Sequence, residues 1–208
     1  MLFKNKRRVI IFLSCLLLLL LYVTRNVSIL IPFSLALIAL FLFSYIDRAF
    51  HFNFPEVYYV YIFAIFVLGT IIGPGDPPFG LYYRDIFFDK VLHFLNPILM
   101  CAILFYTLDR LQISLKWKLI MTVGLVFGIL GLWEIGEYLS DVWLGTLNQG
   151  VYVYDVVTQL KAQQLSDPIT DTMRDLIFGL LGSITFVAYK ITEFHFTKLT
   201  KTKKGMRS

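Results

Sequence analysis

The segment LIMTVGLVFGILGLWEIGEYL, residues 119–139, determines the fold class of this chain. At 1.5 Å per residue it makes a helix of about 30 Å, which is the thickness of the hydrocarbon core of a bilayer. The segment is apolar on every side, and its charges are confined to Glu134 and Glu137 near one end. A helix that is apolar all round over this length is typical of a membrane span.

The composition of the whole chain agrees with this prediction. The 208 residues are 58% hydrophobic and 16% charged, whereas soluble domains are about 45–50% apolar and about 25% charged. A load of 20 Phe and 12 Tyr excludes a disordered chain. Only two cysteines are present, both inside apolar runs, which excludes a disulfide scaffold. We therefore expect an integral membrane protein.

Six apolar runs predict an all-α, polytopic membrane helical bundle with about six transmembrane helices in a single domain, residues 1–208. The expected spans are about 9–23, 29–46, 57–72, 86–108, 119–139 and 172–191, with an outer loop at 140–171. The first run follows four basic residues, as in a signal peptide, but no small-residue cleavage site follows it. We expect a retained signal anchor; a cleaved signal is the alternative.

Part of the outer loop has an amphipathic pattern. Apolar Val156, Val157, Leu160 and Leu165 alternate with acidic, basic and amide side chains. The pattern fits a short helix lying on the outer interface of the membrane. An ordinary lid over the bundle fits equally well, so both alternatives stay open.

The distribution of basic residues predicts the orientation. With six spans, one side of the membrane holds both termini and 14 of the 19 Lys and Arg, and the other side holds five. Because basic residues concentrate on the cytoplasmic side, we expect both termini to be cytoplasmic. The opposite side then carries ten of the 14 acids. The excess of basic residues reflects topology in the cytoplasmic (inner) membrane and gives no support to nucleic-acid binding.

Ionisable residues gather near the expected outer ends of the last three spans. Asp89 and His93 are four residues apart and share one helix face. Glu134 and Glu137 are three apart, and Asp167, Asp171 and Asp175 recur every fourth residue. Sequence neighbours in a bundle are usually neighbours in space, and Gly124, Gly128 and Gly131 permit close approach around the fifth span. We expect the side chains to share one pocket.

This pocket would hold more negative than positive charge. Five carboxylates (Asp89, Glu134, Glu137, Asp171 and Asp175) face Lys90 and Arg174, with Arg84 nearby in the loop. Carboxylates withdrawn from water must be protonated, paired or bound to a metal. Oxygen ligands with one imidazole suit Mg²⁺, Mn²⁺ or Ca²⁺, and also Zn²⁺. Pro97 cannot donate to the carbonyl of His93, which predicts a kink beside the imidazole.

Simpler structural explanations exist for individual members of the set. Asp167 before Pro168 fits an N-cap followed by a first-turn proline, and Asp85 and Asp171 fit partners of helix dipoles. Lys90 can extend to the interface, and Arg174 can form a structural ion-pair network with the glutamates. Asp89 and His93 are the hardest to explain by packing, because an intramembrane acid–imidazole pair is costly.

Other candidate sites fail. His51 and His195 fall on the expected cytoplasmic side, away from the acids, and Cys15 and Cys101 lack acidic or histidine neighbours. The chain has neither a Gly-x-Ser-x-Gly turn nor a phosphate-binding glycine loop.

At these residues the chain resembles the YjdF-like bacterial inner-membrane proteins and, more distantly, the VanZ-like proteins. The matching segments are Asp-Lys-Val-Leu-His-Phe at 89–94, the acids Glu134 and Glu137, and Asp-Thr-Met-Arg-Asp at 171–175. The Asn of the VanZ-like pattern is missing. The resemblance implies a polytopic membrane protein with an outward-facing polar site, and its VanZ-like part implies envelope chemistry.

Three functional hypotheses follow from these residues. In the first, Asp89, His93, Asp171 and Asp175 supply metal ligands, Glu134 or Glu137 is the general base, and Lys90 is catalytic. The substrate would be an envelope lipid or a lipid-linked headgroup. The second hypothesis is a cation or proton transporter, which the outer position of the acids disfavours because transport sites usually lie near the midplane. The third is a non-catalytic scaffold for envelope proteins.

Overall fold

The computed structural model describes residues 10–16, 19, 30–72, 81, 86–145, 148–154 and 161–205. These residues form helices and one two-stranded ribbon, so the predicted all-α class is confirmed. The chain divides into two compact units, which are Met1–Leu92 with Val151–Leu165 and His93–Gly150 with Ser166–Ser208. The first boundary falls inside a continuous helix, Ile86–Leu108.

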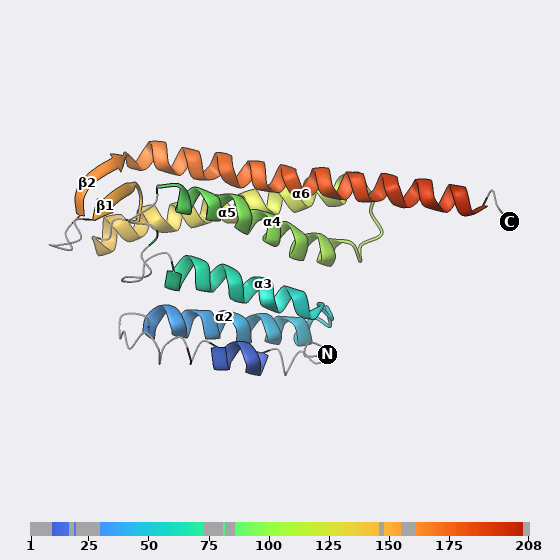
Figure 1. Cartoon of the computed structure of the whole chain (residues 1–208), viewed down its shortest axis with the longest axis horizontal. Helices are drawn as coiled ribbons and strands as arrows, with labels where there is room; N and C mark the ends of the chain where they lie inside the picture. Colours follow the sequence, from blue (N-terminus) through green and yellow to red (C-terminus); the bar gives the residue numbers. More distant parts are fainter. Residues whose placement is uncertain are drawn as a thin grey trace. The chain divides into compact units, whose positions relative to one another are not determined.

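The first unit is built from a helical hairpin. Helix α2, Leu30–Ala49, lies beside α3, Glu56–Phe66, which continues as a π-helical turn, Val67–Ile72 (Figure 1). Residues 10–16 are also helical. The Phe43 ring stacks on Phe54 at 4.9 Å and meets Tyr59 edge-on at 5.0 Å. Aromatic packing therefore holds the end of the hairpin where α2 turns into α3.

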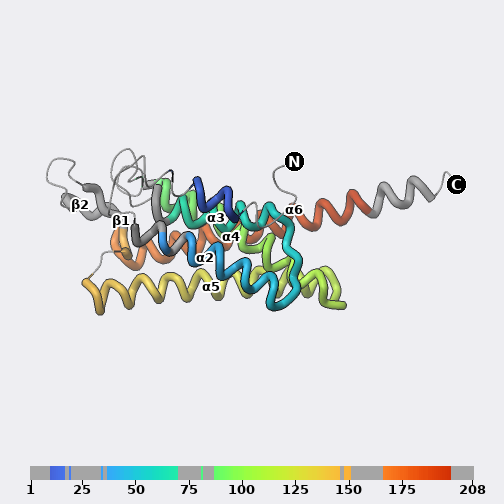
Figure 2. Tube along the Cα trace, turned by 90° about the horizontal axis from the view of Figure 1, so that it is seen from below, coloured from blue at the N-terminus to red at the C-terminus, as the bar shows by residue number. Residues whose placement is uncertain are grey.

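The second unit contains most of helix α4 (Ile86–Leu108) together with α5 (Leu115–Leu144) and α6 (Pro168–Gly205). Helices α5 and α6 run side by side, as Figures 1 and 2 show. All three helices contribute to one apolar core, made of Cys101, Phe105, Leu119, Val126, Leu130 and Phe186. This core fixes the three helices that carry the predicted site residues.

Three helices are long and apolar enough to cross a membrane among the residues described. They are Phe87–Leu108, Leu115–Leu144 and Pro168–Thr197, and Glu56–Gly69 is a shorter apolar helix. The expected spans 29–46 and 57–72 coincide closely with α2 and with α3 plus its π-helical turn. The six-span count and the cytoplasmic termini stay predictions. Part of the first expected span, 9–23, lies outside the described residues.

The segment between α5 and α6 differs from the expected loop. Helix α5 continues to Leu144 and ends at Gly145, which has the left-handed backbone (φ 65°) that favours glycine. Strands β1, Val151–Tyr154, and β2, Lys161–Ser166, then pair as a ribbon. The amphipathic-helix alternative is therefore wrong for residues 161–165, where the backbone pairs with β1, and residues 155–160 lie outside the described residues.

The start of α6 has the predicted cap. Asp167 Oδ1 accepts the backbone N–H of Thr170 at 3.0 Å, and Pro168 occupies the first helical position. The pKa of the Asp167 carboxyl is lowered by its side-chain hydrogen bond with Thr170 and by the Thr170 backbone N–H. The interpretation of this acid as an N-cap is confirmed, and it needs no ligand.

The glycines that allow close helix approach are on α6. A Cβ built at Gly182 would overlap the carbonyl oxygen of Phe94, and one at Gly179 would overlap the Leu130 side chain. Within the described residues, a Cβ at Gly124, Gly128 or Gly131 meets nothing within 4 Å. The prediction that the fifth-span glycines allow close packing is thus wrong for this part of the structure, because their faces point away from α4 and α6.

Substitution of Gly182 by alanine is expected to destabilise the protein. The added methyl group pushes α6 from the Phe94 carbonyl, and overpacking of this kind costs about 1–3 kcal/mol. Gly128→Ala is the matched control, since alanine has space there and a higher helix propensity. Thermal unfolding in detergent should show a lower midpoint for Gly182→Ala and an equal or higher one for Gly128→Ala. Equal midpoints for the two variants would contradict the close contact.

The Asp167 cap is expected to weaken in acid. Because its pKa is lowered in the folded protein, the cap stabilises the helix fully above the unfolded pKa of about 3.9 and is lost as the pH falls through the lower, folded value. Hydrogen exchange at the Thr170 amide should lose protection there in the wild type but not in Asp167→Asn, whose amide caps without titrating. If the protection of the Thr170 amide in the wild type did not change over this pH range, the result would contradict this assignment.

Candidate metal centre

The imidazole of His93 on α4 lies between two carboxylates from different helices. Its Nδ1 is 3.9 Å from Glu134 Oε1 on α5, and its Nε2 is 3.9 Å from Asp175 Oδ1 on α6. All three side chains are largely withdrawn from the surface: His93 is 13% exposed, Glu134 6% and Asp175 4%. The sequence predicts that these three residues share a pocket, and the structure brings them together.

Helix packing explains why these side chains meet. Gly182 and Gly179 on α6 lie against the backbone of α4 at Phe94 and His93, and Gly179 also lies against Leu130 of α5. Asp175 is seven residues before Gly182, which is two helical turns on the same face. Glu134 is one turn after Leu130. Glycine contacts and polar residues therefore occupy consecutive turns of the same interface.

The carbonyl of His93 lies in this interface. Helix α4 continues through Pro97, which is fully buried and cannot donate to the carbonyl four residues before it. The carbonyl oxygen of His93 is 3.6 Å from the position of a Cβ on Gly179. The backbone of α6 therefore covers the point where the proline interrupts the hydrogen bonds of α4.

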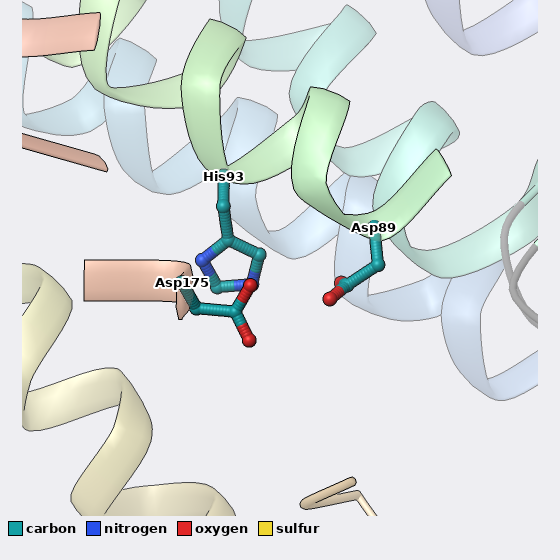
Figure 3. Close-up of side chains that lie close together, drawn as sticks. All are labelled: Asp89, His93 and Asp175. Carbon is teal, nitrogen blue, oxygen red and sulfur yellow. The ribbon is translucent and has the colours of Figure 1, made fainter. Parts of the chain in front are cut away.

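Asp89 joins the set through the geometry of α4. It is four residues before His93 on the same continuous helix, so the two side chains project from one face. Figure 3 shows both of them projecting toward Asp175 of α6. Single ligand atoms from Asp89, His93 and Asp175 all lie within 4.8 Å of one another. The three residues can therefore face one metal ion.

Lys90 is the charged neighbour of Asp89. Its Nζ is 3.0 Å from Asp89 Oδ2, and the Lys90 side chain is only 8% exposed. A solvated lysine at the interface would be more exposed, so the alternative in which Lys90 only extends outward does not describe this side chain. The ammonium group instead places one positive charge beside the Asp89 carboxylate.

The other predicted site residues have different partners. Glu137 Oε1 accepts the indole N–H of Trp133 at 2.7 Å on the same helix. Asp171 is buried, and its Oδ2 accepts the backbone N–H of Gly150 at 3.0 Å. Arg174 is exposed. The structure thus places Asp89, Glu134 and Asp175 around His93, with Lys90 beside Asp89. Asp171 instead contacts the segment that follows α5.

The contacts that fold the segment after α5 were not predicted from the sequence. Both oxygens of Asp141 accept backbone N–H groups, from Asn148 at 2.8 Å and from Gln149 at 2.9 Å. The Gln149 side chain donates to Thr172 Oγ1 at 3.2 Å. The Asn-Gln-Gly sequence at 148–150 is a turn signal that indicates such a fold, but its partners are too distant in sequence to be read from it.

The depth of the centre along α6 follows from the charged groups at the other end of the helices. Lys190 pairs with Glu193 at 2.7 Å and lies over the rings of Phe105 and Tyr189, while Lys118 pairs with Asp109 at 2.8 Å. Asp175 precedes Lys190 by 15 residues, which is about 22 Å of helix. In a core about 30 Å thick, the centre therefore lies well away from the Lys190 end.

The donor set fits a hard or borderline divalent cation. Ligands bound to one ion at about 2.0–2.4 Å are roughly 3–4 Å from each other. The 3.9 Å between His93 Nε2 and Asp175 Oδ1 lies at the upper end of that range. One imidazole with carboxylate oxygens suits Mg²⁺, Mn²⁺, Ca²⁺ or Zn²⁺. A cation at this point would also interact favourably with carboxylates whose burial is costly.

Comparison with known proteins places this chain in a family. No curated protein and no solved structure shows a significant match. The model of one family, described as "Predicted membrane protein (DUF2238)", matches residues 7–194. The resemblance to YjdF-like proteins fits this match, while the resemblance to VanZ-like proteins stays a prediction. Since the match covers most of the sequence and the helices are long enough to span a membrane, the chain belongs to this predicted membrane protein family.

Proposed function

We propose that the protein is a membrane-embedded, metal-assisted enzyme acting on an envelope lipid or a lipid-linked headgroup at the outer leaflet. The observation that carries this proposal is the position of His93, with Glu134 on one side of its ring and Asp175 on the other. Asp89, His93 and Asp175 are the proposed metal ligands. A divalent cation held there would polarise a phosphoryl or acyl oxygen and activate water.

Glu134 has a distinct role in this proposal. Its carboxylate lies on the Nδ1 side of His93, whereas the Asp175 carboxylate lies near Nε2. A carboxylate behind a ligating histidine fixes the tautomer that protonates Nδ1 and leaves the Nε2 lone pair for the metal. Glu134 is therefore proposed as a positioning residue. Glu137, three residues further toward the end of α5, is the proposed general base.

Lys90 supplies the fixed positive charge of the proposed mechanism. Its ammonium group contacts Asp89 and is largely buried. A buried cation beside the reacting group stabilises the negative charge that develops on a phosphoryl or acyl oxygen. The centre is predicted to lie near the outer face of the membrane. Lipid headgroups lie at this interface, so a headgroup is the proposed substrate.

Metal affinity is the first test of this proposal. We expect the purified protein to bind one Mn²⁺ or Zn²⁺ ion and His93→Ala and Asp175→Ala to lose that ion, because each variant removes a ligand. Glu134→Gln should weaken binding about 10–100-fold by releasing the imidazole. Isothermal titration calorimetry with elemental analysis measures both effects.

Glu137→Gln is the matched control for Glu134→Gln. It makes the same change three residues away on the same helix, where the carboxylate accepts from Trp133, and it should keep wild-type metal affinity. Equal weakening by the two variants would contradict the positioning role. If His93→Ala and Asp175→Ala kept the wild-type metal affinity, the result would contradict the proposed metal centre and favour the scaffold hypothesis.

Turnover is the second test. Wild-type protein reconstituted with a bacterial polar lipid extract and metal should change the mass of a headgroup, as measured by lipid mass spectrometry. Glu137→Gln should slow this change while still binding metal, because the proposed base is lost, and His93→Ala should abolish it. Metal binding without headgroup change, together with metal uptake into sealed vesicles, would replace the enzyme with the transporter hypothesis.

A further inference from the structure

A second polar site occurs in the first unit, where α2 turns into α3. Asp47, at the end of α2, is 3% exposed. Its Oδ1 accepts the backbone N–H of Phe54 at 3.0 Å, and its Oδ2 accepts the hydroxyl of Tyr59 at 2.5 Å. Both oxygens of this buried carboxylate are therefore occupied by donors. Asp47 holds the connection between the helices in place.

The backbone of the α2–α3 connection has an unusual conformation, and the contacts of Asp47 explain how it is held. His51 and Asn53 have positive φ angles, 54° and 49°. Non-glycine residues rarely adopt this conformation, although His and Asn tolerate it better than most. Strained conformations persist only where neighbouring contacts impose them, and they are common in ligand clamps.

A cavity of about 290 Å³ opens at this connection. Its walls are formed by Ser44, Asp47, Arg48, His51, Asn53 and Tyr59. Arg48 contributes a permanently charged guanidinium with several donors in a planar fork, and His51 and Asn53 contribute an imidazole and an amide. Since Asp47 accepts hydrogen bonds from the protein, this lining favours an anion with several acceptor oxygens, such as a phosphate group.

A second cavity, of about 540 Å³, borders the first. The two share Ser44 and Arg48, and the larger cavity is otherwise mostly apolar, with Ile10, Ile11 and Phe41 in its lining. Ile11 and Phe41 are more than half exposed. An apolar surface that meets a polar, basic cavity at a shared arginine matches a molecule with a phosphate at one end and a hydrocarbon chain at the other.

We propose that this double cavity binds a phospholipid, with its phosphate held by Arg48 and His51 and an acyl chain along Ile10, Ile11 and Phe41. The basic-residue distribution predicts that the α2–α3 connection is cytoplasmic, where anionic lipids are abundant and basic pockets between helices bind their headgroups. The site goes beyond the proposed enzyme, because it shares no residue with the proposed metal centre.

The test compares three probes on full-length protein in detergent by native mass spectrometry. The probes are phosphatidylglycerol, a diacylglycerol with the same chains, and inorganic phosphate. Wild-type protein should retain one phosphatidylglycerol and should bind the diacylglycerol and inorganic phosphate much more weakly. Arg48→Gln should lower the affinity for phosphatidylglycerol by about tenfold or more, since a charge-assisted contact is lost. Arg48→Lys should restore part of it, because lysine keeps the charge without the planar fork.

Arg110→Gln is the matched control. Arg110 is also an exposed arginine at the end of an apolar helix, but it lies over the Tyr106 ring outside both cavities. This variant should bind phosphatidylglycerol as the wild type does. Equal losses in the two glutamine variants would overturn the site in favour of general charge attraction. Equal affinity for the diacylglycerol would overturn the role of the phosphate, and equal affinity for inorganic phosphate would overturn the lipid as the source. Metal binding at His93 should be unchanged in Arg48→Gln, which separates this test from that of the proposed enzyme.

Discussion

The close contact between Gly182 of α6 and the Phe94 carbonyl of α4 sets the geometry of the second unit. It brings two helix backbones together one residue away from His93, at a level where no side chain separates them. The carboxylate of Asp175, two turns along α6, then faces the imidazole at 3.9 Å. Leu130 packs against Gly179 of the same helix and brings Glu134 of α5 to the other ring nitrogen. A steric requirement for glycine thus determines an electrostatic arrangement.

That arrangement is costly unless its charges are compensated. Glu134 and Asp175 are almost fully buried, and an imidazole at most neutralises one of them. In a region of low dielectric, an uncompensated carboxylate takes up a proton or acquires a cation. Lys90 compensates Asp89 directly. Two buried carboxylates that face the two nitrogens of one imidazole are the physical reason for proposing a metal at this point.

Much of this could be predicted from the sequence, because the relevant signals are local. Hydropathy and length predict the helices, and the four-residue spacing of Asp89 and His93 predicts that they share a face. The Asp-Pro pair at 167–168 predicts the start of α6. Predictions of contacts between helices were less successful. The fifth-span glycines look like a packing motif, yet Gly179 and Gly182 make the contacts, since helix rotation depends on the whole interface. Likewise, Asp171 has the spacing of a ligand but accepts from Gly150, which follows a turn that periodicity does not reveal.

The convergence of His93 with Glu134 and Asp175 can be measured without a metal or a substrate. The chain has only three histidines. Solid-state NMR can therefore detect dipolar couplings between ¹⁵N-labelled histidine and ¹³C-labelled carboxyl groups in lipid bilayers, and a His93→Gln sample identifies the signal of this ring. We expect both ring nitrogens of His93 to couple to a carboxyl carbon, as the two 3.9 Å nitrogen–oxygen separations require. A His93 signal without coupling to any carboxyl group would contradict the shared site and the metal centre built on it.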